Sequence, residues 1–153
     1  MRLFLECDAD ERLARLMGFT RRDIEHAGGK GAVCNGLLRN RGVLGMVDED
    51  PNKSQPAYLS TCRLIGEQHR IRLLADEERG NRVVMLCPDL EGWLVEALKK
   101  QKIPHSKFGL PDNPEHVHGV INTRLKAVED IVRALNEAGS KPLEYLQSLL
   151  KPT

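Results

Sequence analysis

The sequence lacks the features that would define a protein class at once. Its 153 residues include only one Trp, two Tyr and three Phe, and no apolar run is long enough for a signal peptide or a membrane-spanning helix. The formal net charge is +1, so the chain as a whole has no strong positive field with which to attract nucleic acid. Binding of that kind would therefore depend on a local basic patch.

The four cysteines, at positions 7, 34, 62 and 87, are too far apart in sequence for a Cys-x-x-Cys metal knuckle. Reduced, buried thiols are the simplest interpretation, and they are typical of the cytoplasm. Apolar residues make up 41% of the chain and charged residues 29%, as in a folded, water-soluble domain. We therefore expect a cytoplasmic protein that is not attached to a membrane.

Hydrophobic periodicity alternates between strands and helices along the chain, and this predicts an α/β fold. Strands are expected over residues 3–5, 23–27, 43–47, 70–75 and 82–87. Helices are expected over residues 8–17, 32–39, 58–65 and 90–98. The run 43–47 is apolar at nearly every position, which is typical of a parallel strand that is covered on both faces. The strands at 70–75 and 82–87 form either a hairpin or a parallel pair, so the sheet is parallel or mixed.

Residues 103–153 differ in character from the first 102 and are expected to form a loop followed by two helices. The segment 103–120 is rich in Pro, His and Gly and is predicted to be a loop, in which His116 and His118 are interpreted as solvent-exposed. The helices that follow carry leucines at helical spacing. These leucines must pack on the sheet of the same chain or on a second copy in a homodimer.

Acidic residues follow three of the predicted strands. Glu6 and Asp10 come after the first strand, Asp48-Glu49-Asp50 after the strand at 43–47, and Asp89-Leu90-Glu91 after the last. In parallel α/β sheets, ligands bind outside the carboxyl ends of the strands. Crowded carboxylates repel one another, so their convergence there would favour a bound cation.

Asp48 and Asp50 are two residues apart, so an extended backbone would point both the same way, about 6–7 Å apart. Two carboxylates at that spacing can share a Mg²⁺ or Mn²⁺ ion, which prefers oxygen ligands and retains several waters. Glu49 would point the opposite way. The alternative is ordinary turn chemistry before Pro51, and Asp10 alone is a favourable acid in the first turn of a helix.

Gly28-Gly29-Lys30-Gly31 precedes a predicted helix. Exposed backbone N–H groups there could hold a phosphate, with Lys30 as a positive charge. The segment is neither a Walker A motif nor a dinucleotide fingerprint. A tight glycine turn without a ligand is an equally good interpretation.

The order of these motifs resembles the toprim domain, which is shared by topoisomerases, bacterial primases, OLD-family nucleases and a ribosomal-RNA maturase. Phe4-Leu5-Glu6-Cys7-Asp8-Ala9-Asp10 stands where the family commonly has Glu-Gly followed by an acid. Gly28-Gly29-Lys30-Gly31 and Val47-Asp48-Glu49-Asp50 stand at its glycine-rich turn and its Asp-x-Asp. Pro88-Asp89-Leu90-Glu91 is similar to the extra acidic element of the OLD-like branch. The sequence departs from the family at Cys7, where glycine is usual.

The resemblance implies a toprim-like domain over residues 1–102 with a Mg²⁺- or Mn²⁺-dependent nuclease activity on DNA or RNA. By analogy, Glu6, Asp48 and Asp50 would be catalytic metal ligands, and Asp10 and Glu91 would complete a second metal site. Lys30 or Lys53 would assist through its charge.

The alternative function is that of a non-catalytic toprim subunit. Such a subunit would bind nucleic acid or a separate ATPase in a larger assembly, and the net charge near zero and the apolar C-terminal helices favour this alternative. A haloacid-dehalogenase-type phosphatase fits less well, because Pro51-Asn52 stands where that class needs Thr or Val.

Overall fold

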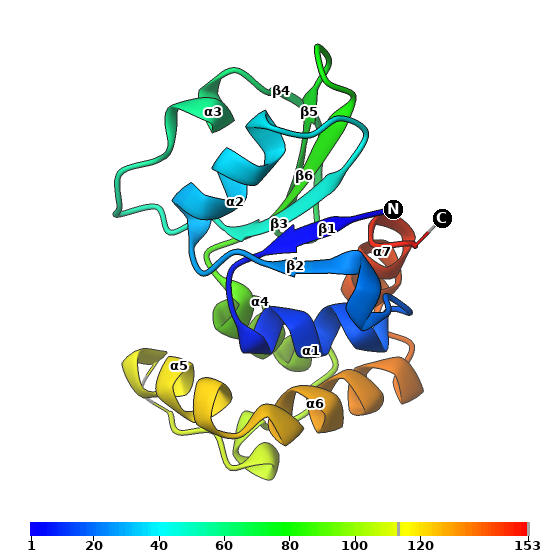
Figure 1. The fold of residues 1–153 in the computed structure, drawn as a ribbon. Coiled ribbons are helices and arrows are strands. Elements are labelled where there is room, and N and C mark those ends of the chain that lie inside the picture. The colour runs from blue at the N-terminus through cyan, green and yellow to red at the C-terminus, as the bar shows by residue number, and fades with distance from the viewer. Residues whose placement is uncertain (113, 153) are drawn as a thin grey trace.

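Six strands form one mixed sheet with the order β2-β1-β3-β6-β5-β4 (Figure 1). The computed structural model describes the backbone of residues 1–112 and 114–152, and their side chains except those of residues 114–116, 118 and 122. The strands are β1 (Leu3–Leu5), β2 (Ile24–His26), β3 (Leu44–Asp48), β4 (Arg63–Gln68), β5 (Ile71–Asp76) and β6 (Asn81–Leu86). The helices are α1 (Asp8–Leu16), α2 (Lys30–Leu38), α3 (Ala57–Ser60), α4 (Leu90–Lys100), α5 (Pro114–Thr123), α6 (Leu125–Glu137) and α7 (Lys141–Leu149).

Four neighbouring strands, β2, β1, β3 and β6, are parallel, and β5 and β4 continue the sheet in antiparallel pairing. The chain runs from β1 through α1 to β2 on one side, then returns through α2 to β3 on the other side of β1. Right-handed crossovers in opposite directions require connecting helices on opposite faces of the sheet, and α1 and α2 lie that way (Figure 1). The strand order therefore reverses between β1 and β3.

Each face of the sheet has its own apolar core. On one face, residues of α2 and α3 pack on the sheet, including Val33 and Leu37. On the other face, residues of α1, α4, α6 and α7 form the larger core, which contains the buried Trp93. Together these layers confirm the predicted α/β fold with a sheet flanked by helices. None of the helices described is long and apolar enough to cross a membrane.

The predicted C-terminal helices are confirmed as α6 and α7. The Ser140 side chain caps α7 by accepting a hydrogen bond from the backbone N–H of Leu143, at 3.3 Å. Leu135, Leu143 and Leu146 are buried in the core that α1 and α4 also share. The leucines of this region therefore pack within their own chain and do not require a second copy.

The predicted helix over residues 58–65 is wrong for most of its length. Only Ala57–Ser60 is helical, and β4 begins at Arg63. β4 pairs with β5 through a two-residue turn in which His69 and Arg70 both have positive φ, at 53° and 58°. Two-residue hairpin turns usually contain Asn-Gly or Asp-Gly. His69-Arg70 is neither, so the turn could not be recognised from its residues.

The segment 103–120, predicted to be a loop, contains a 3₁₀ turn over His105–Phe108 and the start of α5. A proline is compatible with the first turn of a helix, so the composition that indicated a loop did not exclude one. The side chains of His116 and His118 lie outside the described residues. The pair β5 and β6 is a hairpin, which settles the alternative that the sequence left open.

We expect the α6 packing to contribute strongly to stability. Leu135→Ala removes a fully buried side chain and should lower the free energy of unfolding by about 2–5 kcal/mol. Leu38→Ala is the matched control, because Leu38 is 45% exposed and should lose less than about 1 kcal/mol. Urea denaturation followed by circular dichroism measures both. Equal losses would show that α6 does not belong to the cooperative core.

Candidate functional site

The predicted acidic residues lie at the carboxyl ends of β1, β3 and β6, which are adjacent parallel strands. Glu6 follows β1 and Asp48 ends β3, so they flank the position at which the strand order reverses. A crevice forms at such a reversal because the connections leave the sheet toward opposite faces. The fold thus places Glu6 and Asp48 where α/β proteins commonly bind ligands.

Glu6 and Asp48 are joined directly. The backbone N–H of Asp48 donates to Glu6 Oε2 at 2.9 Å, and the backbone N–H of Leu90 donates to Asp48 Oδ1, also at 2.9 Å. These bonds fix one oxygen of each carboxyl group and bring the ends of β1, β3 and α4 together. Burial raises the pKa of Glu6, and the neighbouring charge of Asp50 adds to the rise.

Asp10 is almost completely buried, with 2% of its surface exposed. It lies in the first turn of α1, whose N-cap is Cys7. Asp10 Oδ2 accepts bonds from the backbone N–H of Cys7 at 3.2 Å and from its thiol at 3.3 Å. Burial, followed by the charges of Glu6 and Glu91, raises the pKa of Asp10 to about 7. Asp10 thus combines the helix-capping role with a place in the acidic group.

The charges of all the neighbouring carboxylates act on Asp48. Its pKa is raised to about 9, first by burial and then by the charges of Asp10, Glu91, Glu6 and Asp50. Repulsion of this kind requires carboxylates close enough to interact through a poorly hydrated region. We call Glu6, Asp10, Asp48 and Glu91 the carboxylate cluster.

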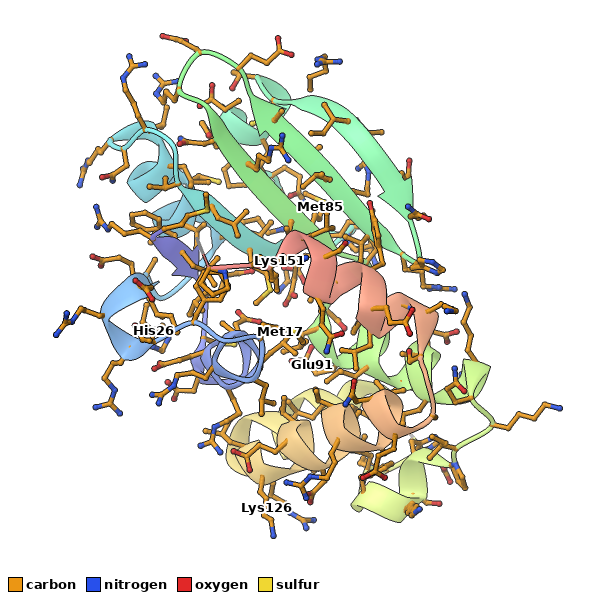
Figure 2. All side chains as sticks on the ribbon, turned by 90° about the vertical axis from the view of Figure 1, so that its right-hand side faces the viewer. Met17, His26, Met85, Glu91, Lys126 and Lys151 are labelled. Atoms are coloured by element: carbon orange, nitrogen blue, oxygen red, sulfur yellow. The ribbon has the colours of Figure 1, made fainter. Side chains whose placement is uncertain are left out.

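Glu91 lies in the first turn of α4 and is 4% exposed. Figure 2 shows it toward the middle of the molecule, whereas a helix-terminal acid that served only the helix dipole would be free to face water. The N-cap of α4 is supplied by Asp89, which accepts a bond from the backbone N–H of Gly92 at 2.7 Å. Asp89 therefore performs the capping role, and the burial of Glu91 needs another explanation.

The predicted extended spacing of Asp48 and Asp50 is wrong. β3 ends at Asp48, and Asp50 adopts a left-handed backbone with φ of 46°, which Asp tolerates better than most residues. Asp50 instead forms an ion pair with Lys30, at 3.4 Å between Oδ2 and Nζ. Lys30 Nζ also donates to the Glu49 carbonyl at 2.9 Å and to Gln55 Oε1 at 3.1 Å. Lys30 and Asp50 therefore form a charged rim beside the carboxylate cluster.

The glycine-rich turn follows β2 at the same edge of the sheet. Gly28 has φ of 98°, and α2 begins at Lys30, two residues earlier than predicted. A Cβ built at Gly28, Gly29 or Gly31 would meet nothing within 4 Å, so the turn is open to solvent. The backbone of the turn is therefore accessible to a ligand from solvent.

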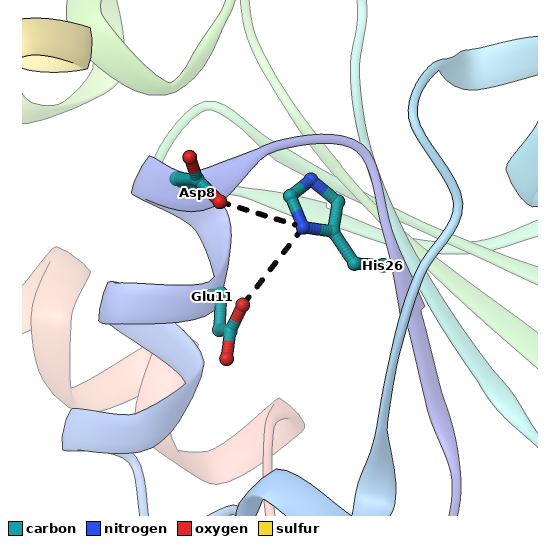
Figure 3. Close-up of side chains that lie close together, drawn as sticks. All are labelled: Asp8, Glu11 and His26. Carbon is teal, nitrogen blue, oxygen red and sulfur yellow. Dashed lines mark ion pairs between the residues drawn. The ribbon is translucent and has the colours of Figure 1, made fainter.

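A second group of metal-ligating side chains was missed by the sequence analysis. Asp8 and Glu11, in the first turn of α1, face His26 at the end of β2 (Figure 3). His26 Nδ1 lies 3.4 Å from Asp8 Oδ1 and 3.9 Å from Glu11 Oε2. The i, i+3 spacing of the two acids is visible in the sequence. The position of His26 beside them follows only from the parallel pairing of β1 with β2.

The two groups differ in the distances between their potential ligand atoms. Among the described residues, the set of three with all ligand atoms within 4.8 Å of one another is Asp8, Glu11 and His26. No three members of the carboxylate cluster have ligand atoms that all lie within that distance of one another. Their spacing suits an ion that keeps part of its water shell, or two ions, better than one ion bound directly by three of them.

Comparison with known proteins finds no matching family model, no matching curated protein and no matching solved structure.

Proposed function

We propose that this protein is a Mg²⁺- or Mn²⁺-dependent phosphodiesterase of the toprim type that acts on DNA or RNA. The observation that carries the proposal is the convergence of the carboxylate cluster, with Asp10 and Glu91 buried and Glu6 and Asp48 half-buried, at the reversal between β1 and β3. Carboxylates that crowd together away from water are costly, and the raised pKa values of Asp10 and Asp48 express that cost. A divalent cation would remove it, because oxygen-rich clusters suit Mg²⁺ and Mn²⁺.

The residues divide naturally into those that would hold metal and those that would hold substrate. Glu6, Asp10, Asp48 and Glu91 would bind the ion or ions, which would activate a water molecule and neutralise charge on the leaving oxygen. Asp50 is a weaker ligand candidate than the sequence predicted, because it is engaged by Lys30.

Positive and open surfaces at the same edge support a phosphate-containing substrate. Lys30 and the turn Gly28-Gly29 border the cluster on the β2 side. On the other side, Asp89 and Glu91 line a cavity of about 280 Å³ that Arg70 and Lys99 also line. A nucleic-acid backbone that crossed this edge would therefore meet the open glycine turn on one side of the carboxylates and the cations Arg70 and Lys99 on the other.

Assays of the purified protein on plasmid DNA, single-stranded DNA and RNA, with Mg²⁺ or Mn²⁺, test the proposal. Cleavage that requires the ion is expected. Nucleic-acid binding without cleavage in either metal would instead support the non-catalytic subunit. The packing of the C-terminal leucines within their own chain removes one reason for that alternative, since those leucines need no ATPase partner to cover them.

Glu91→Gln provides a sharper test of the cluster. The substitution preserves size and removes the charge, so we expect turnover in saturating Mn²⁺ to fall at least about 100-fold, with the fold intact. Glu67→Gln is the control, because Glu67 lies on the exposed edge strand β4, outside both the cluster and the residues lining the cavity, and pairs with Arg72 at 3.7 Å. Single-turnover cleavage measures both. Unchanged turnover in Glu91→Gln would remove Glu91 from the metal site.

A further inference from the structure

We propose that Asp8, Glu11 and His26 form a separate binding site for a divalent transition-metal ion such as Zn²⁺ or Co²⁺. A helix and the strand that follows it supply the site, with both carboxylates from α1 and the imidazole from β2 (Figure 3). An imidazole ligand favours Zn²⁺, Co²⁺ or Ni²⁺ over Mg²⁺. The site therefore differs in chemistry from the carboxylate cluster, which contains only oxygen donors.

The distances suit a shared ion. Metal–nitrogen and metal–oxygen bonds of about 2.0–2.2 Å place neighbouring ligand atoms about 3.0–3.4 Å apart in octahedral or tetrahedral geometry. Asp8 Oδ1 lies 3.4 Å from His26 Nδ1, within that range, and Glu11 Oε2 lies 3.9 Å from it. A side-chain adjustment of less than about 1 Å at Glu11 would complete three ligands of one ion.

The helix dipole alone does not explain the arrangement. Both contacts of His26 Nδ1 lie within ion-pair distance, and both exceed the length of a direct hydrogen bond, about 2.7–3.2 Å, so the imidazole lies between the carboxylates without a direct hydrogen bond to either. The helix dipole accounts for Asp8 and Glu11 in the first turn of α1, but it gives no reason for an imidazole between them. The convergence of all three ligand atoms within 4.8 Å is what a metal site requires.

The surroundings leave the ion accessible and favour one that bonds nitrogen strongly. Asp8 and Glu11 line a polar cavity of about 490 Å³, so water can fill the remaining coordination positions. Arg12, Arg15 and Arg21 line the same cavity, and their charges oppose any cation there, although Arg12 is paired with Glu129 at 2.7 Å. An ion in this site must offset that repulsion through its bond to the His26 nitrogen, which a transition metal forms more strongly than Mg²⁺ does.

Zinc titration of metal-free, ¹⁵N-histidine-labelled protein tests the proposal. The ring nitrogens of the five histidines can be followed by NMR, and the His26 signals are assigned from the His26→Gln spectrum. We expect the His26 Nδ1 signal to move to a new position at one equivalent of Zn²⁺ and to stay there in excess Mg²⁺. Calorimetry should show one site lost in His26→Gln and at least tenfold weaker binding in Glu11→Gln.

Two controls separate this site from others. His105→Gln alters a similar histidine–carboxylate pair, in which His105 Nε2 lies 2.9 Å from Asp112 Oδ1. This pair does not belong to the three-ligand group, so the variant should leave zinc binding unchanged. Asp48→Asn alters the carboxylate cluster and should also retain the His26 response. An unmoved His26 signal at stoichiometric Zn²⁺, or loss of that response in Asp48→Asn, would overturn the proposal. Neither result depends on whether the protein cleaves nucleic acid.

Discussion

Replacing Asp48 with asparagine is expected to abolish metal-dependent cleavage and to stabilise the metal-free protein. Asparagine retains a side-chain oxygen that can accept the hydrogen bond from Leu90, but it removes the charge that a metal ion needs. The wild-type carboxyl group has its pKa raised to about 9 by burial and by four neighbouring carboxylates. At pH 7 this perturbation opposes folding, so its removal should raise the free energy of unfolding by about 1–3 kcal/mol.

The control for this variant is Glu49→Gln. Glu49 is adjacent in sequence, and it meets Lys30 through its backbone carbonyl, which the substitution leaves in place. Turnover in saturating Mn²⁺ and urea denaturation in a chelator should both remain near wild type. If Asp48→Asn is less stable than wild type at pH 7 and still cleaves, then Asp48 serves the β3–α4 connection and the metal proposal fails.

β1, β3 and the end of β6 could be predicted from the sequence, because each is a short apolar run with an acidic residue close behind it. That pattern also identified which side chains would share one edge, since parallel strands end together. The placement of Glu6 next to Asp48 follows from the pairing of β1 with β3. Local sequence therefore contained most of what positions the carboxylate cluster.

The antiparallel part could not be predicted, because its signals are weak. β4 is an exposed edge strand, so its residues lack a hydrophobic alternation that would distinguish it from a helix. The turn at His69 and Arg70 uses positive φ at two residues other than glycine, and neither is the Asn or Asp that usually marks such a turn. Asp50 was misplaced for a similar reason, because its left-handed backbone turns it toward Lys30.

The burial of Glu91 and the position of His26 depend on tertiary structure alone. Glu91 reads in sequence as an acid in the first turn of a helix, and only the packing of α4 against the larger core explains why it is buried. His26 ends a strand of three residues and meets Asp8 and Glu11 because α1 connects β1 to β2. For both residues the local sequence indicates only a position at the end of a helix or strand. The carboxylates that surround each of them are brought there by the fold.

The stability of the metal-free protein is expected to fall as the pH rises from about 4 to 9. Asp10 and Asp48 have ordinary pKa values of 3.8 that the fold raises to about 7 and about 9. The folded state therefore holds protons that the unfolded chain has already released, and stability decreases with pH in that interval. The stabilisation that comes from the retained protons is complete below about pH 4. It is lost for Asp10 by about pH 7 and for Asp48 by about pH 9. Each retained proton gives a slope of about 1.4 kcal/mol per pH unit.

Saturating Mg²⁺ should reverse this trend. Metal ligands must be deprotonated, so binding strengthens as the pH rises and stabilises the folded state more at high pH. Urea denaturation at pH 5, 7 and 9, in a chelator and in Mg²⁺, should give two curves that diverge with pH. Asp48→Asn should flatten the chelator curve above pH 7, where Asp48 is the titrating group, and should bring the two curves together. A chelator curve that is level or rises between pH 5 and pH 9 would mean that the carboxylates are not held as strained neighbours. The reason for a metal ion at this edge of the sheet would then be lost, whatever the protein cleaves.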